Sequence, residues 1–423
     1  PVHLHYTEDV FASDGSLLHS KGDYILNEEG GKQYDDGSES RSESDAASNG
    51  RHLLWESEKN KLWNAANTLQ GNAYVDVSFL RDFTFSLKGN ISLRNIEDSQ
   101  YGNAEIGAYK DTGFISKIDQ EYTLQQLLAW KHQFGRHFVE WMVGHENYDY
   151  KLNFDAIQKK NKSFPGIDEL SNFTTTTYSE GYKDTYRTEG HFTRARYDYN
   201  ETYFAEASFR RDGSSIFHTD HRWGNFWSVS AAWDMAKENF ISHIDWINML
   251  KLKASFGQQG NDNLLYKGYT NYYPYQDQFT VSGSEGVFSD GVLFYKGNKD
   301  ITWETSNSFN VGVDFALLKG CVDGTIEYFN RQTKDMLYYK PVAMSNGYTQ
   351  FPMNIGSVRN SGIEIELNYT PIQTNNFKWV INWNGTMMKN KILELHPDLK
   401  GEMINGSYIY REGESLYQFY LTK

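Results

Sequence analysis

The chain has 423 residues, a formal net charge of −14 and 16% aromatic residues, but only 7 prolines. The acid excess excludes a nucleic-acid-binding surface, which needs a surplus of Lys and Arg. The single cysteine, Cys321, excludes an internal disulfide framework and a cysteine-based zinc site. The mean hydropathy of −0.68 and the lack of an apolar run of about 18 residues exclude a helical membrane protein. A membrane β-barrel remains open, because its lumen face and outer loops are polar.

Residues 1–69 form the least regular part of the chain, and we expect an extracellular-loop and barrel-entry segment there. The run of Ser and acidic residues at 35–45 predicts a solvated segment. A calcium loop is the sharper alternative, but the ordered ligand spacing with its closing Glu is missing. No charged-then-apolar leader follows Pro1, and the chain ends at Lys423 inside a patterned segment. We therefore expect a piece of a longer polypeptide.

Strict alternation of apolar and polar residues begins at Phe83 and runs to Arg94. A strand has a period of two, so this segment has one apolar and one polar face. The same pattern returns at 363–369 and 377–384. In 222–235, Trp227, Val229, Ala231, Trp233 and Met235 share one face, and Ser228, Ser230 and Asp234 share the other. These segments predict strands buried or lipid-covered on one side only.

About twelve strands are expected from 70 onward, and they come in pairs. The predicted pairs are 70–80 with 83–95, 122–131 with 137–149, 186–199 with 202–211, 222–235 with 250–258, 303–316 with 322–334, and 361–370 with 377–390. Short connections join the members of each pair, except that a somewhat longer link containing Trp246 and Leu250 joins 222–235 to 250–258. The long stretches 96–121, 150–185, 212–221, 259–302 and 335–360 separate the pairs. Short turns on one side and long loops on the other are typical of an up-and-down membrane barrel.

Other β architectures build the same alternating strands. Soluble barrels, sandwiches and propellers are the alternatives. A sandwich predicts scattered loop lengths and shorter strands, and the missing repeat of about 40 residues weighs against a propeller. The pattern therefore favours an all-β fold, part of a large antiparallel transmembrane β-barrel, over residues 70–423, incomplete at both ends.

Catalytic motifs are missing from the sequence, so we expect no enzyme, no metal and no cofactor. His218 and His221 flank Thr219-Asp220 and suggest a metal, although histidines in a polar loop are more often solvated. An aromatic cluster follows the 250–258 strand: Tyr266, Tyr269, Tyr272, Tyr273, Tyr275 and Phe279. Aromatic rings pack on the apolar faces of sugars, so Tyr272, Tyr273 and Tyr275 are the candidate substrate-binding residues. Loop packing or a partner-protein surface is the alternative.

Six segments resemble the SusC/RagA-like family of TonB-dependent outer-membrane transporters. The most distinctive reads SFRRDGSS at 208–215, followed by RWGNFWSVSAAW at 222–233. Segments similar to those of the family also occur, in the family's order, at 250–262, 302–306, 331–337 and 354–367. The glycines in these segments suit the curvature of a barrel wall.

The resemblance implies TonB-dependent import of a bulky nutrient, an oligosaccharide or a peptide, across the outer membrane of a Gram-negative, Bacteroidetes-like cell. It also implies a SusD-like surface lipoprotein as a lid, and TonB acting through an N-terminal region and a plug domain that this chain lacks. The family barrel has 22 strands, of which about twelve are expected here. A soluble or surface glycan-binding adhesin is the alternative, and a secreted glycan-degrading enzyme with a carboxylate pair is a third possibility.

Overall fold

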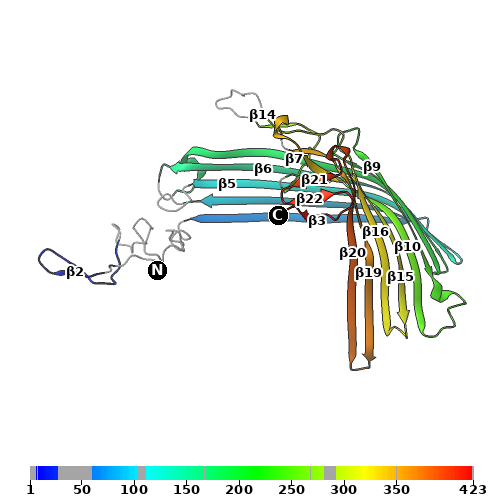
Figure 1. Cartoon of the computed structure of the whole chain (residues 1–423). Coiled ribbons are helices and arrows are strands. Elements are labelled where there is room, and N and C mark those ends of the chain that lie inside the picture. The colour runs from blue at the N-terminus through cyan, green and yellow to red at the C-terminus, as the bar shows by residue number, and fades with distance from the viewer. Residues whose placement is uncertain are drawn as a thin grey trace. The chain divides into compact units, whose positions relative to one another are not determined.

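The computed structural model describes residues 6, 8–26, 60–102, 111–164, 167–266, 268–280, 292–348 and 350–421. Twelve long strands dominate it (Figure 1). They are β3 (Lys61–Phe79), β4 (Phe83–Tyr101), β5 (Asp111–Phe134), β6 (His137–Lys162), β7 (Phe173–Tyr199), β8 (Tyr203–Ser214), β9 (Trp223–Asp234), β10 (Ile247–Asn261), β15 (Glu304–Leu317), β16 (Val322–Lys334), β19 (Gly356–Gln373) and β20 (Lys378–Leu395). The predicted all-β fold with about twelve strands is confirmed.

The remaining elements are short. The short strands are β1 (Val10–Phe11), β2 (Leu17–His19), β11 (Leu265–Tyr266), β12 (Tyr269–Thr270), β13 (Gln278–Thr280), β14 (Val292–Tyr295), β17 (Leu337–Pro341), β18 (Gln350–Asn354), β21 (Glu402–Asn405), β22 (Tyr408–Arg411) and β23 (Gln418–Phe419). The 3-10 turns are η2 (Leu170–Asn172), η3 (Met235–Lys237), η4 (Met344–Asn346) and η5 (Pro397–Leu399). Within the ranges that the structure covers, no helix has both the length and the apolar character needed to cross a membrane.

The long strands form one sheet in the order β20-β19-β16-β15-β10-β9-β8-β7-β6-β5-β4-β3. Each strand pairs with its neighbours in the chain order of long strands, and the pairs from β7 to β20 are antiparallel. In Figure 1, β15, β16, β19 and β20 lie side by side. This is the up-and-down order that the alternating loop lengths predict.

The chain divides into two compact units. The first comprises Pro1–Gly71, Ile91–Glu121 and Lys151–Asp184. In it, Lys61 Nζ lies 2.5 Å from Asp168 Oδ2. The side chain of Asn172 donates to the carbonyls of Phe164 and Ile167, both at 2.8 Å, and so closes the β6–β7 connection.

The second unit comprises Asn72–Asn90, Tyr122–Tyr150 and Thr185–Lys423. Three of its tight turns place two consecutive residues at positive φ. The residues are Leu80 and Arg81, Asn200 and Glu201, and Leu318 and Lys319, the last pair being followed by Gly320, also at positive φ. Positive φ at both central residues is the geometry of type I′ hairpin turns, which matches the twist of the flanking strands. The predicted connections at Leu80, Asn200 and Leu318 are therefore correct. The first turn carries no residue type that favours this conformation, whereas the second has Asn200 and the third has Gly320.

Several predicted loops are in fact strands. The stretches 96–121 and 150–185 belong largely to β4, β5, β6 and β7, within the part of them that the structure describes. β7 has 27 residues, whereas a tilted membrane strand needs about 9–11. Where a strand continues beyond the membrane both faces meet water, so the alternation of apolar and polar residues is lost. Backbone pairing and β-favouring Thr and Tyr residues still hold it extended.

Two of the predicted boundaries differ in the structure, and one predicted segment is not described. β3 begins at Lys61 rather than at 70. The stretches 259–302 and 335–360 contain the short strands β11–β14 and β17–β18, and β19 begins at Gly356. The Ser- and acid-rich run at 35–45, with its calcium alternative, lies outside the described residues.

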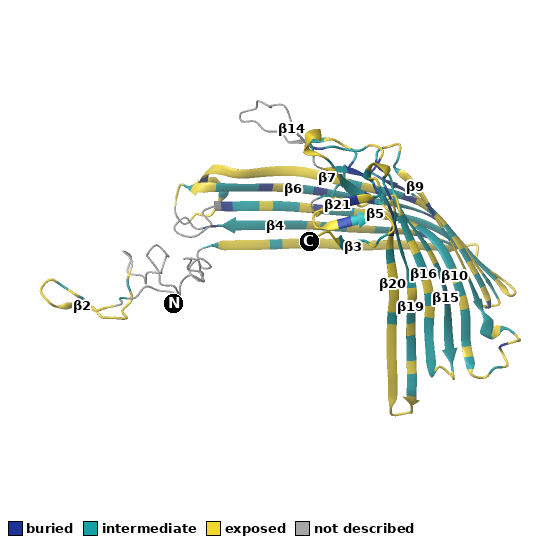
Figure 2. Ribbon diagram, in the orientation of Figure 1, coloured by how far each residue is buried: buried dark blue, intermediate teal, exposed yellow. Residues whose placement is uncertain are grey.

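The two predicted faces are present, and the register extends them across the sheet. One row of directly paired residues runs over five strands and is apolar: Trp233, Leu252, Val313, Ile326 and Ile365. No other part of the described chain covers the apolar side chains on this face: Ile326 is 47% exposed and Val229 is 45% exposed. Figure 2 shows such exposed positions along β20, which is exposed over most of its length. An apolar face of this extent fits lipid rather than water.

We predict that replacing Ile365 by Lys lowers the free energy of unfolding by about 2–4 kcal/mol, because the ammonium enters hydrocarbon near the middle of the strand. Denaturant unfolding and heat-modifiable gel migration of the membrane-extracted protein measure the change. The matched control is Thr386→Lys, which places the same charge on the polar face opposite Glu364. Equal stability of the two variants would contradict the assignment of the faces.

Candidate functional site

The polar face of the sheet in the second unit carries a network of side-chain hydrogen bonds. Ser208 Oγ and Ser228 Oγ lie 2.7 Å apart, and Thr325 Oγ1 donates to Asp314 Oδ1 at 2.9 Å. Ion pairs join the same face, as between Arg194 Nη2 and Glu140 Oε1 at 2.8 Å. Such a face satisfies its polar groups without a covering layer of protein.

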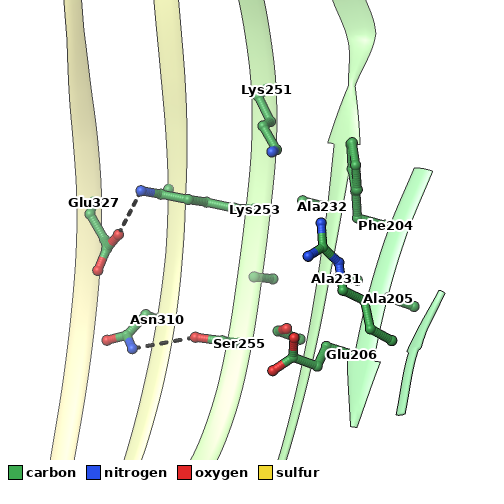
Figure 3. A pocket seen from close by; sticks show the side chains of 14 residues that line it. Phe204, Ala205, Glu206, Ala231, Ala232, Lys251, Lys253, Ser255, Asn310 and Glu327 are labelled. Carbon is green, nitrogen blue, oxygen red and sulfur yellow. Dashed lines mark hydrogen bonds and ion pairs between the residues drawn. The ribbon is translucent and has the colours of Figure 1, made fainter. Parts of the chain in front are cut away.

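A hollow of about 370 Å³ lies on this part of the sheet (Figure 3). Polar and charged side chains from six strands line it: Arg196, Glu206, Ser230, Lys251, Lys253, Ser255, Asn310 and Glu327. One aromatic ring, Phe204, takes part, with Lys251 Nζ 4.4 Å from its centroid. Cations, carboxylates and one ring offer contacts to a polar solute of mixed chemistry.

Lys253 occupies the centre of this lining. Its Nζ lies 2.9 Å from Asp314 Oδ1 and 3.2 Å from Glu327 Oε2, and Figure 3 shows the contact with Glu327. The register explains the reach, because Gly312 lies directly opposite Lys253 and separates it from Glu327. A Cβ at Gly312 would be 3.0 Å from Lys253 Cε. Because Gly312 has no side chain, the side chain of Lys253 has room to cross β15 at this position.

The long loops that follow these strands share a hydrophobic core. Ile216, Phe217, Leu264, Ile301 and Leu337 form this loop core. They come from three different connections, those after β8, β10 and β16. The loops are therefore packed on one another.

Polar contacts tie the loop core to the strand ends. Trp303 Nε1 donates to the Arg222 carbonyl at 2.9 Å. Asn354 Nδ2 donates to the Thr302 carbonyl at 2.9 Å and to the Asp335 carbonyl at 2.7 Å. These bonds connect the same three loops, so a partner or solute would meet them as one layer.

The three predicted substrate-binding residues lie in this layer. Tyr272 packs at 5.8 Å from the ring of Tyr150 and 5.9 Å from that of Tyr186. The Tyr273 hydroxyl accepts a hydrogen bond from the Thr185 backbone N–H at 3.0 Å. Tyr275 meets the ring of His218 edge-on at 6.0 Å. The structure places Tyr272 and Tyr273 against β6 and β7, and Tyr275 beside the loop after β8.

The rest of the aromatic cluster is divided. Tyr266 packs at 5.4 Å from Tyr295 and at 5.2 Å from Tyr339, and Tyr269 is 80% exposed. Burial raises the pKa of both Tyr295 and Tyr339 above the usual tyrosine range. These hydroxyls therefore stay neutral and serve to hold the loop. The side chain of Phe279 lies outside the described residues.

His218 and His221, the histidine pair suggested as a metal site, contact two different aspartates. His218 Nδ1 lies 3.2 Å from Asp220 Oδ2, whereas His221 Nε2 lies 3.9 Å from Asp300 Oδ1. Neither belongs to a group of three potential ligands within the described ranges.

Comparison with known proteins identifies the architecture. A family model described as TonB dependent receptor-like, beta-barrel, matches residues 7–411. The chain belongs to this family. It is therefore an outer-membrane β-barrel protein and not an enzyme. In such barrels the polar face of each strand lines the interior. This agrees with the resemblance of the six sequence segments.

Two curated relatives and one solved structure illustrate the relationship. TonB-dependent receptor P39 of Formosa agariphila is 31% identical over 274 residues, 65% of this chain and 24% of that protein. TonB-dependent receptor SusC of Bacteroides thetaiotaomicron is 28% identical over 321 residues, 67% of this chain and 32% of that protein. The structure of the RagAB peptide transporter shares the fold, with a TM-score of 0.79 over 86% of this chain and 41% of that chain at 20% identity. The chain thus spans less than half the length of these relatives.

The Lys253 group was not predicted from the sequence. Lys251 and Lys253 alternate on one strand, which signals a shared polar face. Their carboxylate partners are 61 and 74 residues away in the chain for Lys253, and only the strand register brings them together.

We predict that Lys253→Met destabilises the barrel by about 1 kcal/mol, because it leaves the carboxylates of Asp314 and Glu327 without their shared cation. The value is modest since all three side chains are a quarter to a third exposed. Denaturant unfolding measures it. The double variant Lys253→Met/Glu327→Gln should recover part of the loss, and no recovery would contradict the shared ion pair.

Proposed function

We propose that this chain forms part of the barrel of a receptor that imports a bulky nutrient across the outer membrane, using energy transmitted by TonB. Membership of the TonB-dependent receptor family is the observation that carries the proposal. The polar hollow on the interior face and the loop layer above the strands fit a wide polar conduit with a ligand-contacting entrance.

The proposed nutrient is an oligosaccharide or a peptide. One relative is named SusC, and the solved structure with the same fold is that of a peptide transporter. The interior lining carries charges of both signs, which suits a peptide, while the tyrosines of the loop layer suit either class. We propose a SusD-like surface lipoprotein as the lid over this loop layer, in line with the SusC/RagA resemblance.

Both edges of the sheet support an assembly larger than these twelve strands. β3 and β20 have a neighbour on one side only, within the residues that the structure describes. Unpaired backbone groups do not occur in the hydrocarbon region of a membrane. We propose that both strands pair with further strands of a closed barrel.

Extraction of the native protein from outer membranes in mild detergent is the test of the assembly. We expect a polypeptide larger than 49.0 kDa that co-purifies with a surface lipoprotein, with a bound glycan or peptide identified by mass spectrometry. A detergent-independent species of 49.0 kDa would favour the glycan-binding adhesin alternative instead.

Tyr275 is the sharpest test among the tyrosines, because its ring contacts are fewer than those of Tyr272. We predict that Tyr275→Ala weakens nutrient binding by about 2- to 10-fold, from the loss of about 0.5–1.5 kcal/mol of aromatic packing. Calorimetry on the purified complex and growth on the transported nutrient measure this. Tyr275→Phe is the matched control and should keep most of the affinity. Wild-type binding by an assembled Tyr275→Ala receptor would assign this ring to loop packing.

A further inference from the structure

Three potential metal ligands converge on the apolar side of the sheet, away from the interior hollow. His145 of β6 and Glu189 and His191 of β7 form this His–Glu cluster, and their ligand atoms all lie within 4.8 Å of one another. Glu189 Oε1 lies 3.2 Å from His145 Nε2 and 3.4 Å from His191 Nε2. The two imidazole rings are stacked at 4.7 Å. The carboxylate therefore faces two imidazole nitrogens at once.

The hydrogen bond behind His145 sets its tautomer. Gln126 Oε1 lies 2.7 Å from His145 Nδ1, and an amide oxygen can only accept, so Nδ1 carries the proton. In the neutral ring Nε2 then presents its lone pair to the carboxylate of Glu189. Two acceptors face each other over 3.2 Å, and this contact needs a proton or a cation between them. A ligating histidine commonly donates its second ring N–H in this way.

The spacing suits a small divalent ion. Bonds of about 2.0–2.2 Å from Zn²⁺ to N and O place neighbouring ligands of a tetrahedral site about 3.3–3.5 Å apart. The distances from Glu189 to the two histidine nitrogens are close to this value. A rotation of the exposed His191 ring would bring its nitrogen closer to that of His145. Imidazole and carboxylate together select Zn²⁺, Cu²⁺ or Ni²⁺ over Ca²⁺ or Mg²⁺.

The cluster lies where a solute can reach it. His145 is eight residues from the start of β6, and His191 eight residues from the end of β7. A tilted strand crosses the hydrocarbon in about 9–11 residues, so the cluster lies near the level at which the strands leave the membrane on the side of the long loops. The side chains of His145, Glu189 and His191 are 31%, 45% and 55% exposed.

An aromatic and a cationic side chain neighbour His191. Trp223 stacks on His191 at 6.1 Å. Arg211, directly opposite His191 in the register, lies over the ring of Trp223 at 5.1 Å. Its charge is engaged by that ring, and the stack holds His191 against β6.

We propose that His145, Glu189 and His191 form a binding site for a divalent transition metal of the Zn²⁺ class on the outer wall of the barrel, with Gln126 as the positioning residue of His145. Water completes the coordination. The metal joins β6 to β7 at the outer boundary of the membrane. Sequence analysis gave no signal for it, because His145 is 44 residues from Glu189 and only strand pairing unites them.

The test is a Co²⁺ titration of the full-length receptor complex, purified in detergent and freed of metal by chelation. We expect the metal-free receptor to bind one equivalent of Co²⁺ at this site, with a visible d–d absorption band. Adding Zn²⁺ should displace the Co²⁺ and remove the band. Glu189→Gln and His191→Ala should each abolish that absorption. Gln126→Leu should weaken binding by about 10–100-fold, as for other groups behind a ligand.

His137→Ala is the matched control, since His137 lies on the same strand β6 but binds the Tyr197 hydroxyl instead. It should titrate like the wild type. Heat-modifiable gel migration establishes that each variant is assembled. Absence of the absorption in the wild type, or its persistence in both Glu189→Gln and His191→Ala, would overturn the proposal and leave a proton-mediated contact in the cluster.

Discussion

Continuous backbone pairing from β7 to β20 is the constraint on which the rest of the structure depends. Every long strand in this range pairs with the next in antiparallel register. The hydrocarbon core of a membrane contains no water that could replace these backbone hydrogen bonds. Because side chains alternate along a strand, one register assigns every residue to a face. A slip of one position would bring Lys253 and Glu327 to lipid and Ile326 to the interior.

The same register determines what each face can do. On the interior face it sets Gly312 between Lys253 and Glu327, so that a lysine on β10 reaches a carboxylate two strands away. On the apolar face, the neighbouring strands β6 and β7 bring His145 beside His191 and Glu189. The loops follow a different rule. Their positions depend on the loop core of Ile216, Phe217, Leu264, Ile301 and Leu337, which has no strand periodicity.

Much of the fold was predictable from residue pattern. The faces of 222–235 and the turns at Leu80, Asn200 and Leu318 follow from alternation and from the interruptions between alternating runs. The predicted loops 96–121 and 150–185 were wrong, because β5, β6 and β7 continue there as strands whose two faces both meet water. Alternation reports a difference between two environments, so it disappears where both sides are water. The candidate tyrosines 272, 273 and 275 were found by composition, but their contacts with Tyr150, Thr185 and His218 were not.

By itself the sequence determined the all-β class, the number of long strands, the alternation of short and long connections, and the resemblance to an outer-membrane transporter family. These properties are local, since each depends on residue types a few positions apart. Tertiary structure decided which side chains meet: Lys253 with Asp314 and Glu327, Trp303 with Arg222, and His145 with Glu189. Each of these contacts joins residues far apart in the chain, and only the pairing of strands and the packing of loops sets their distance.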